Sequence, residues 1–276
     1  MITCVNILCY EPNKIMIDFI KDMYNYFKEK KLNYSIYLTI DSDKKEYKSE
    51  EEYTVIQFDH KKATRAGYKD ILLRYYHRKD TKVKSMALDK SLYYFTRNNK
   101  FDYYWFIEDD IFIPSVKTIP YLDKKYKEAD LLIGSCKEKK DDKMDWHWPL
   151  MVRNNRNKLR KKRLEKAEKS KDYYFEKPWY HGWCQVFRIS RKFIEKIEEF
   201  VKKNKTLTFM EFFFATLAKK NEMKISEVEE FKLKLCYECK EKNLFKLNEI
   251  SWKNLYHYFK DLDTQKEFRE RKNYKY

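Results

Sequence analysis

Three acidic residues stand together at the end of an apolar run. Glu108, Asp109 and Asp110 directly follow the residues from Tyr103 to Ile107. If the chain stays extended through the acids, Glu108 and Asp110 share one face and Asp109 points the other way. Two carboxylates on one face repel each other unless a cation lies between them, and hard divalent cations prefer oxygen ligands. The pattern therefore predicts a divalent-cation site; the alternative is an acidic turn with all three side chains in water.

The segments around these acids predict an alternation of strands and helices. Short apolar runs typical of strands alternate with stretches whose apolar residues recur at helical spacing. The expected strands are residues 2–10, 34–40, 54–58 and 103–107, and the expected helices cover 15–27 and the turns around Leu88, Leu92 and Phe95. We therefore expect an α/β fold with a mainly parallel central sheet that is flanked by helices on both faces.

The second half of the sequence is less regular. Strands are expected at 131–136 and 183–189, and helices from Ser190, a suitable N-cap, to about Lys203 and again over 209–219. Residues 153–171 form a dense basic stretch with little apolar periodicity, which predicts an exposed helix or an insertion. Neither an internal repeat nor a linker divides the sequence, so a single domain is expected.

Composition sets broad limits on the protein. The 276 residues are 43% hydrophobic, which suffices for one large core. The six cysteines are scattered, and the lone pair Cys236 and Cys239 lacks the second pair that zinc sites usually need, so we expect a reducing, cytoplasmic location. No apolar stretch approaches the ~20 residues that cross a bilayer. The net charge of +17 attracts anions, but lysine is spread throughout the chain, so this charge indicates no particular partner.

The acidic block resembles the DxD-type motif of glycosyltransferases with the nucleotide-diphospho-sugar transferase (GT-A) fold, a Rossmann-like family. The resemblance implies that Asp110 binds Mn²⁺ or Mg²⁺, while Glu108, where aspartate is usual, meets the nucleotide or assists the metal ligand. Tyr10 and Asp41 follow the first two expected strands, as in the nucleotide-binding half of that family. They are expected beside the base and at a ribose hydroxyl or the uracil edge, with Asp109 also assigned to donor binding. An aspartate that simply forms a turn is the alternative for Asp41.

Later segments carry the same resemblance. Glu211 stands at the start of an expected helix rich in phenylalanine, and it resembles the general base of inverting members. The alternative is an acid that is favoured there only by the helix dipole. The segment from Leu255 to Asp261 resembles one in which a histidine, here His257, completes the metal site and a lysine, here Lys260, meets the diphosphate. Tyr258 stands where proline is usual.

Two further features belong to this comparison. The segment His181-Gly182-Trp183-Cys184-Gln185 resembles an acceptor-side loop. Its glycine predicts that the backbone comes close to a ligand or to another segment. The basic residues Arg65, Lys84 and Lys90 all precede the acids, and the sequence does not decide which of them meets the diphosphate.

The resemblance implies a hexosyltransferase-like enzyme spanning 1–276. Residues 1–135 would form the nucleotide-sugar-binding half, and 136–276 the acceptor-binding half with a basic insertion at about 153–172. The expected partners are a nucleotide-diphosphate sugar, with a UDP-sugar favoured, and a glycan or protein acceptor. Inversion or retention and the oligomeric state stay open.

Two other functions fit the sequence less well. A nucleotidyltransferase would need a glycine-rich basic loop after the first strand, and residues 11–14 contain no glycine. A nucleic-acid-binding protein would use the basic stretch, but the acidic triplet opposes phosphate binding, so nucleic acid is not the expected partner.

Overall fold

The central sheet has seven strands and is mainly parallel, which confirms the expected α/β class. The computed structural model describes residues 1–70, 84–138, 174–233, 245–257 and 259–270. The strand order is β3-β2-β1-β4-β8-β5-β9, and β8 alone runs antiparallel to its neighbours within this sheet. The strands are β1 (Thr3–Cys9), β2 (Tyr34–Ile40), β3 (Thr54–Ile56), β4 (Tyr103–Glu108), β5 (Leu131–Ile133), β8 (Val186–Ser190) and β9 (Ile225–Glu227).

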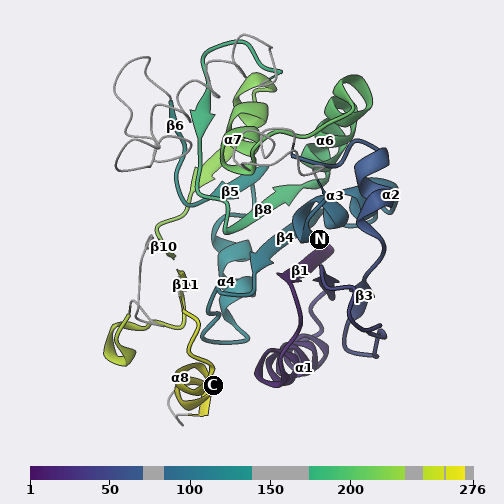
Figure 1. The fold of residues 1–276 in the computed structure, drawn as a ribbon. Coiled ribbons are helices and arrows are strands. Elements are labelled where there is room, and N and C mark those ends of the chain that lie inside the picture. Colours follow the sequence, from purple (N-terminus) through teal and green to yellow (C-terminus); the bar gives the residue numbers. More distant parts are fainter. Residues whose placement is uncertain (71–83, 139–173, 234–244, 258, 271–276) are drawn as a thin grey trace, which may run out of the picture.

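Helices cover both faces of this sheet (Figure 1). Alternate residues of β1 enter different cores because successive side chains of a strand point to opposite faces. Val5 and Ile7 pack with α1 (Lys14–Glu29) and α4 (Thr118–Lys125). Cys4 and Leu8 pack on the other face with helices α3 (Ala87–Arg97), α6 (Arg191–Asn204) and α7 (Met210–Lys220), beside the short α2 (His60–Arg65). The buried sheet thus has a hydrophobic core on each side.

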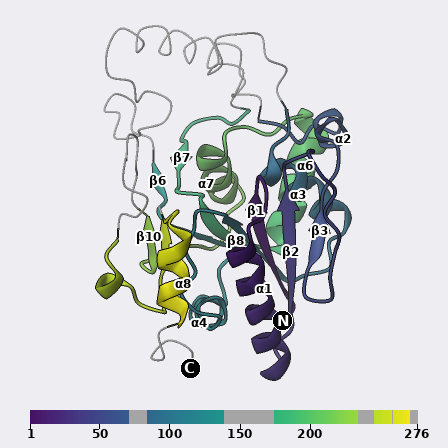
Figure 2. The ribbon, with the colours of Figure 1, turned by 60° about the horizontal axis from the view of Figure 1, so that its bottom comes forward.

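The last part of the chain folds back onto the loop that follows β4. β10 (Phe231–Leu233) pairs in parallel with β11 (Leu255–His257), and the 3₁₀ turn η2 (Leu247–Glu249) lies between them in sequence. The backbones of Phe112 and Tyr256 exchange hydrogen bonds of 2.8 and 3.2 Å. Figure 2 shows α8 (Leu262–Glu270) on the same side of the sheet as α1, where the Arg269 guanidinium lies 3.7 Å from the Phe19 ring centroid.

A local sequence signal explains where α6 begins, whereas two strands differ from their expected bounds. The Ser190 hydroxyl accepts a hydrogen bond of 3.2 Å from the Phe193 amide, which confirms the predicted N-cap of α6. The strands expected at 131–136 and 183–189 are shorter, since β5 ends at Ile133 and β8 begins at Val186. Between them, β6 (Lys137–Glu138) and β7 (Tyr180–His181) form a separate antiparallel pair. None of the helices formed by the described residues has the length and apolar character needed to cross a membrane.

A buried ion pair under the sheet gives the first prediction. Arg188 and Asp123 are 0% and 1% exposed, and Nη1 lies 2.6 Å from Oδ1. Asp123 also accepts hydrogen bonds from the Trp105 indole and the Tyr34 hydroxyl. The Asp123→Ala variant should lower the free energy of unfolding by about 3–5 kcal/mol, because it leaves the Arg188 charge buried without a counter-charge.

Urea unfolding followed by circular dichroism measures this loss. Asp18→Ala is the matched control, because Asp18 forms an exposed ion pair with Lys14 on α1 and its removal should change little. Equal effects of the two substitutions would show that the buried pair does not stabilise the fold in this way.

Candidate functional site

The candidate site lies where the strand order changes direction along the sheet. β1 has β2 on one side and β4 on the other, and parallel sheets bind ligands outside the carboxyl ends of such strands. In the register, Cys9 pairs with Ile40 and Leu8 pairs with Glu108. The residues that follow β1, β2 and β4 therefore meet at one edge.

A turn, and not an extended strand, brings two of the acids together. β4 ends at Glu108, and the amide of Ile111 donates a 3.0 Å hydrogen bond to the Glu108 carbonyl. The chain therefore does not stay extended through the three acids. Glu108 and Asp110 nevertheless converge, because the turn folds Asp110 back: one ligand atom each from Glu108, Asp110 and His257 lie within 4.8 Å of one another.

His257 and Lys260 reach this cluster through the C-terminal part of the chain. His257 Nε2 lies 3.7 Å from Asp110 Oδ1, and Lys260 Nζ lies 3.6 Å from Asp110 Oδ2. The Phe112–Tyr256 bridge and a 3.2 Å hydrogen bond from the Phe259 amide to the Asp110 carbonyl hold the two segments together. The structure thus brings together Glu108, Asp110, His257 and Lys260, to which the resemblance gives roles in binding the metal and the nucleotide diphosphate.

The donor atoms of this cluster fit a divalent cation. Asp110 Oδ1 is buried, yet it accepts no hydrogen bond. Such an atom is costly unless something else satisfies it, and a cation would do so. Two carboxylates with one imidazole suit Mn²⁺, and carboxylates also suit Mg²⁺.

The electrostatics of the acids favour an added positive charge. Burial and, after it, the charges of Asp110, Asp109 and Glu211 together raise the pKa of Glu108 to about 8, against the opposing effect of Lys260. Burial, followed by the Asp110 charge, also raises the pKa of Asp109. Ionising these acids at neutral pH therefore becomes easier when a cation is present.

The raised pKa of Glu108 gives a pH-dependent stability prediction. The folded protein holds this proton more tightly than the unfolded chain, so stability falls as pH rises from the ordinary pKa of 4.5 to about 8. In metal-free protein, Glu108→Gln should therefore raise the Tm relative to wild type at pH 8.5, by roughly 3 °C or more, and change it little near pH 4.5. Thermal unfolding in a chelating buffer measures both values. A gain in Tm that is equal at the two pH values would contradict this explanation, and Glu29→Gln on exposed α1 serves as the control.

Glu211 lies in the first turn of α7, and its charge acts on Glu108. Its Oε2 lies 3.1 Å from His181 Nε2, and its Oε1 accepts a 3.2 Å hydrogen bond from Gln185 Nε2. The Gln185 carbonyl in turn accepts a 3.0 Å hydrogen bond from the Glu108 amide, so the Glu211 carboxylate is connected to the end of β4. His181 and Gln185 belong to the segment around Gly182, but nothing in the sequence indicated that their side chains contact Glu211.

Gly182 allows the close approach that its position predicted. A Cβ atom there would lie 2.3 Å from Ile133 Cδ1 and 2.7 Å from the Ser135 carbonyl oxygen. The Gly182 amide also donates a 2.7 Å hydrogen bond to the Glu211 carbonyl. The approach is to a protein segment, and it places the start of α7 next to the sheet.

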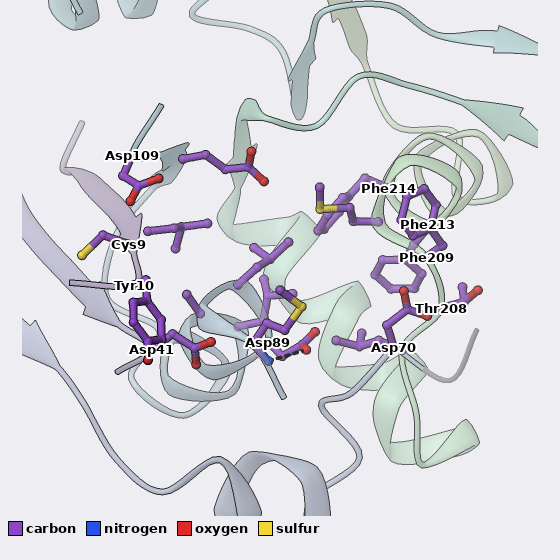
Figure 3. A pocket seen from close by; sticks show the side chains of 18 residues that line it. Cys9, Tyr10, Asp41, Asp70, Asp89, Asp109, Thr208, Phe209, Phe213 and Phe214 are labelled. Carbon is purple, nitrogen blue, oxygen red and sulfur yellow. Dashed lines mark hydrogen bonds between the residues drawn. The ribbon is translucent and has the colours of Figure 1, made fainter. Parts of the chain in front are cut away.

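A cavity of about 500 Å³ extends from the acids towards α7 (Figure 3). Tyr10, Asp41 and Asp109 lie on one side of it, and Phe213 and Phe214 lie on the other. Sequence reasoning placed the first three residues at a donor site, and the structure places all of them at this cavity.

Asp41 has a strong partner inside the protein. Its Oδ1 lies 2.7 Å from the nearly buried Nζ of Lys90. Lys90 was one of the cations considered for the diphosphate, and here it neutralises Asp41. The Cys9 thiol also lines the cavity; burial, together with the charges of Asp109 and Asp41, raises its pKa to about 12, so it is not a thiolate nucleophile at neutral pH.

No family model and no curated protein matches the sequence. The side chains themselves must therefore indicate the chemistry. The predicted basic insertion at about 153–172, the pair Cys236 and Cys239, and Tyr258 lie outside the described residues.

Proposed function

We propose that this protein is a metal-dependent glycosyltransferase with a single GT-A-like domain, which moves a sugar from a nucleotide diphosphate to an acceptor hydroxyl. One observation carries the proposal: Glu108, Asp110 and His257 converge at the carboxyl edge of the sheet, with Lys260 beside them. A nucleotide diphosphate needs positive charge where its phosphates lie, and a metal ion together with a lysine provides it.

The donor would lie across the carboxyl ends of β1, β2 and β4. Asp110 and His257 would hold Mn²⁺ or Mg²⁺, with Glu108 assisting, and the bound cation would supply Lewis-acid stabilisation of the departing diphosphate. Lys260 is half exposed, so its ammonium, which lies 3.6 Å from Asp110 Oδ2, is accessible to phosphate oxygens of a ligand. Tyr10, which is 54% exposed, offers its ring to the base, while Asp41 and Asp109 accept hydrogen bonds from sugar or base donors.

Glu211 would act on the acceptor. In an inverting reaction the acceptor oxygen attacks the anomeric carbon as the bond from that carbon to the diphosphate oxygen breaks, and the acceptor proton passes to the Glu211 carboxylate. His181 and Gln185 hold the two oxygens of that carboxylate in place. A carboxylate fixed in this way loses little freedom when it meets the acceptor, which supports a role as a base.

A binding screen tests the proposal. Thermal unfolding is measured with UDP, GDP and their sugars, each with Mn²⁺, with Mg²⁺ and with a chelator. We expect a Tm increase of roughly 5 °C at saturating ligand that requires both nucleotide and metal. Product formation from the stabilising donor, with water or a sugar as acceptor, then tests transfer. If no nucleotide diphosphate gives a metal-dependent shift, the proposal is wrong.

A further inference from the structure

The wall of the cavity beside the acids is mostly apolar and rigid. The rings of Phe213 and Phe214 are each 1% exposed, and their centroids lie 5.3 Å apart. Phe214 also packs on Phe187 of β8 at 4.5 Å, so this wall is part of the hydrophobic core. The other apolar residues that line the cavity are Leu8, Cys9, Met86, Ala87, Leu88, Leu92, Leu207, Phe209 and Met210.

Among the described residues, the ionisable side chains that line this cavity are mainly acidic. Its described lining residues include five acids and no lysine or arginine. The acids are Asp41, Asp70, Asp89, Glu108 and Asp109. Lys90, the nearby cation, is already paired with Asp41 at 2.7 Å. A carboxylate brought into the cavity by a ligand would therefore face acids, and no lysine or arginine among the described lining residues, which is unfavourable.

The same lining suits a neutral ligand that has both hydrogen-bond donors and an apolar group. Carboxylates accept hydrogen bonds from hydroxyl and amide N–H groups. Apolar rings and aliphatic side chains favour contact with a methyl group. A few polar groups in an apolar pocket fix the orientation of the bound ligand. An acetamido group combines an N–H donor with a methyl group, whereas glucose has a hydroxyl at the corresponding position.

We propose that this cavity receives the sugar of the donor and selects an uncharged sugar with an apolar substituent, such as an acetamido group, over sugar acids. This inference rests on the proposed function. The acids at the metal cluster border the cavity through Glu108, so a diphosphate held there leaves its sugar next to the apolar wall.

Binding of four uridine ligands tests this selection. The dissociation constants of UDP, UDP-glucose, UDP-N-acetylglucosamine and UDP-glucuronic acid are measured by calorimetry with Mn²⁺. We expect the acetamido sugar to bind roughly fivefold tighter than glucose. The sugar acid should bind at least ~30-fold more weakly than glucose. UDP alone reports on the metal and nucleotide contacts. If UDP binds with metal but the sugar acid binds as well as glucose, or glucose as well as the acetamido sugar, the selection is refuted and the proposed function stands. If UDP does not bind, both fail.

A gain-of-binding variant locates the selection in this cavity. Met86 lines the cavity and is 55% exposed, so Met86→Lys adds a cation at a tolerant position. It should bring UDP-glucuronic acid to within about threefold of UDP-glucose, and the affinity for UDP, measured in the same variant, separates this effect from a general gain in affinity for anions. Ile2→Lys, at an exposed residue before β1 and outside the cavity lining, is the matched control and should keep the wild-type ratio. If Met86→Lys also keeps that ratio, the charge of this cavity does not select the sugar.

Discussion

Asp110→Ala is expected to abolish metal-dependent nucleotide binding and to lower sugar transfer by about a thousandfold or more. Asp110 is the centre of the cluster: one of its oxygens faces His257 at 3.7 Å and the other faces Lys260 at 3.6 Å. No group donates a hydrogen bond to its buried Oδ1, so removal of that oxygen breaks no internal hydrogen bond. Loss of function without loss of fold is therefore the expected pattern.

Thermal shift and activity assays separate these two effects. The metal-free Asp110→Ala protein should unfold at or above the wild-type Tm, because removal of one acid relieves the repulsion that raises the pKa of Glu108. Asp18→Ala on the exposed face of α1 should keep the full metal response. His257→Ala should weaken the same response, and the double variant should lose less than the sum of the two single losses if both residues bind one ion. A full Mn²⁺-dependent shift in Asp110→Ala would exclude this metal site.

Glu211→Gln should lower transfer by about 10²–10⁴-fold while metal and donor binding persist. The substitution keeps the shape of the side chain but removes the oxygen basicity that accepts a proton. Because Glu211 also raises the pKa of Glu108, the variant should bind metal at least as well as wild type at pH 7. Single-turnover transfer and calorimetry on the same preparation measure the two properties.

The neighbours of Glu211 provide the test of positioning. His181→Ala and Gln185→Ala each free one oxygen of the carboxylate, so transfer should fall by about tenfold in each, less than in Glu211→Gln. Glu195→Gln on α6 is an exposed control. Unchanged transfer in Glu211→Gln would show that another group takes the acceptor proton, and loss of donor binding together with transfer would indicate that Glu211 positions the sugar.

Local pattern was enough to predict the strands that carry the site. The apolar runs that form β1, β2 and β4 end within one residue of Tyr10, Asp41 and Asp109, so their carboxyl ends could be read from the residues alone. Ser190 likewise marks the start of α6. These signals are local because side-chain periodicity and capping depend on residues a few positions apart.

Direction and long-range pairing could not be predicted in the same way. The residues of the buried strand β8 are compatible with either direction, so its antiparallel position between β4 and β5 has no sequence signal. The turn after Glu108 was one of two conformations that the sequence left open, because acids are compatible with an extended chain and with a turn.

By itself, the sequence determined which side chains are available and which strand ends present them. Only the tertiary structure decided which of them meet: Asp110 with His257 across 147 positions, and Glu211 with His181 and Gln185. The physical reason is that those contacts depend on the order of strands in the sheet and on the return of β11 to the loop after β4. Both are set by the burial of two cores at once, which no short segment of sequence encodes.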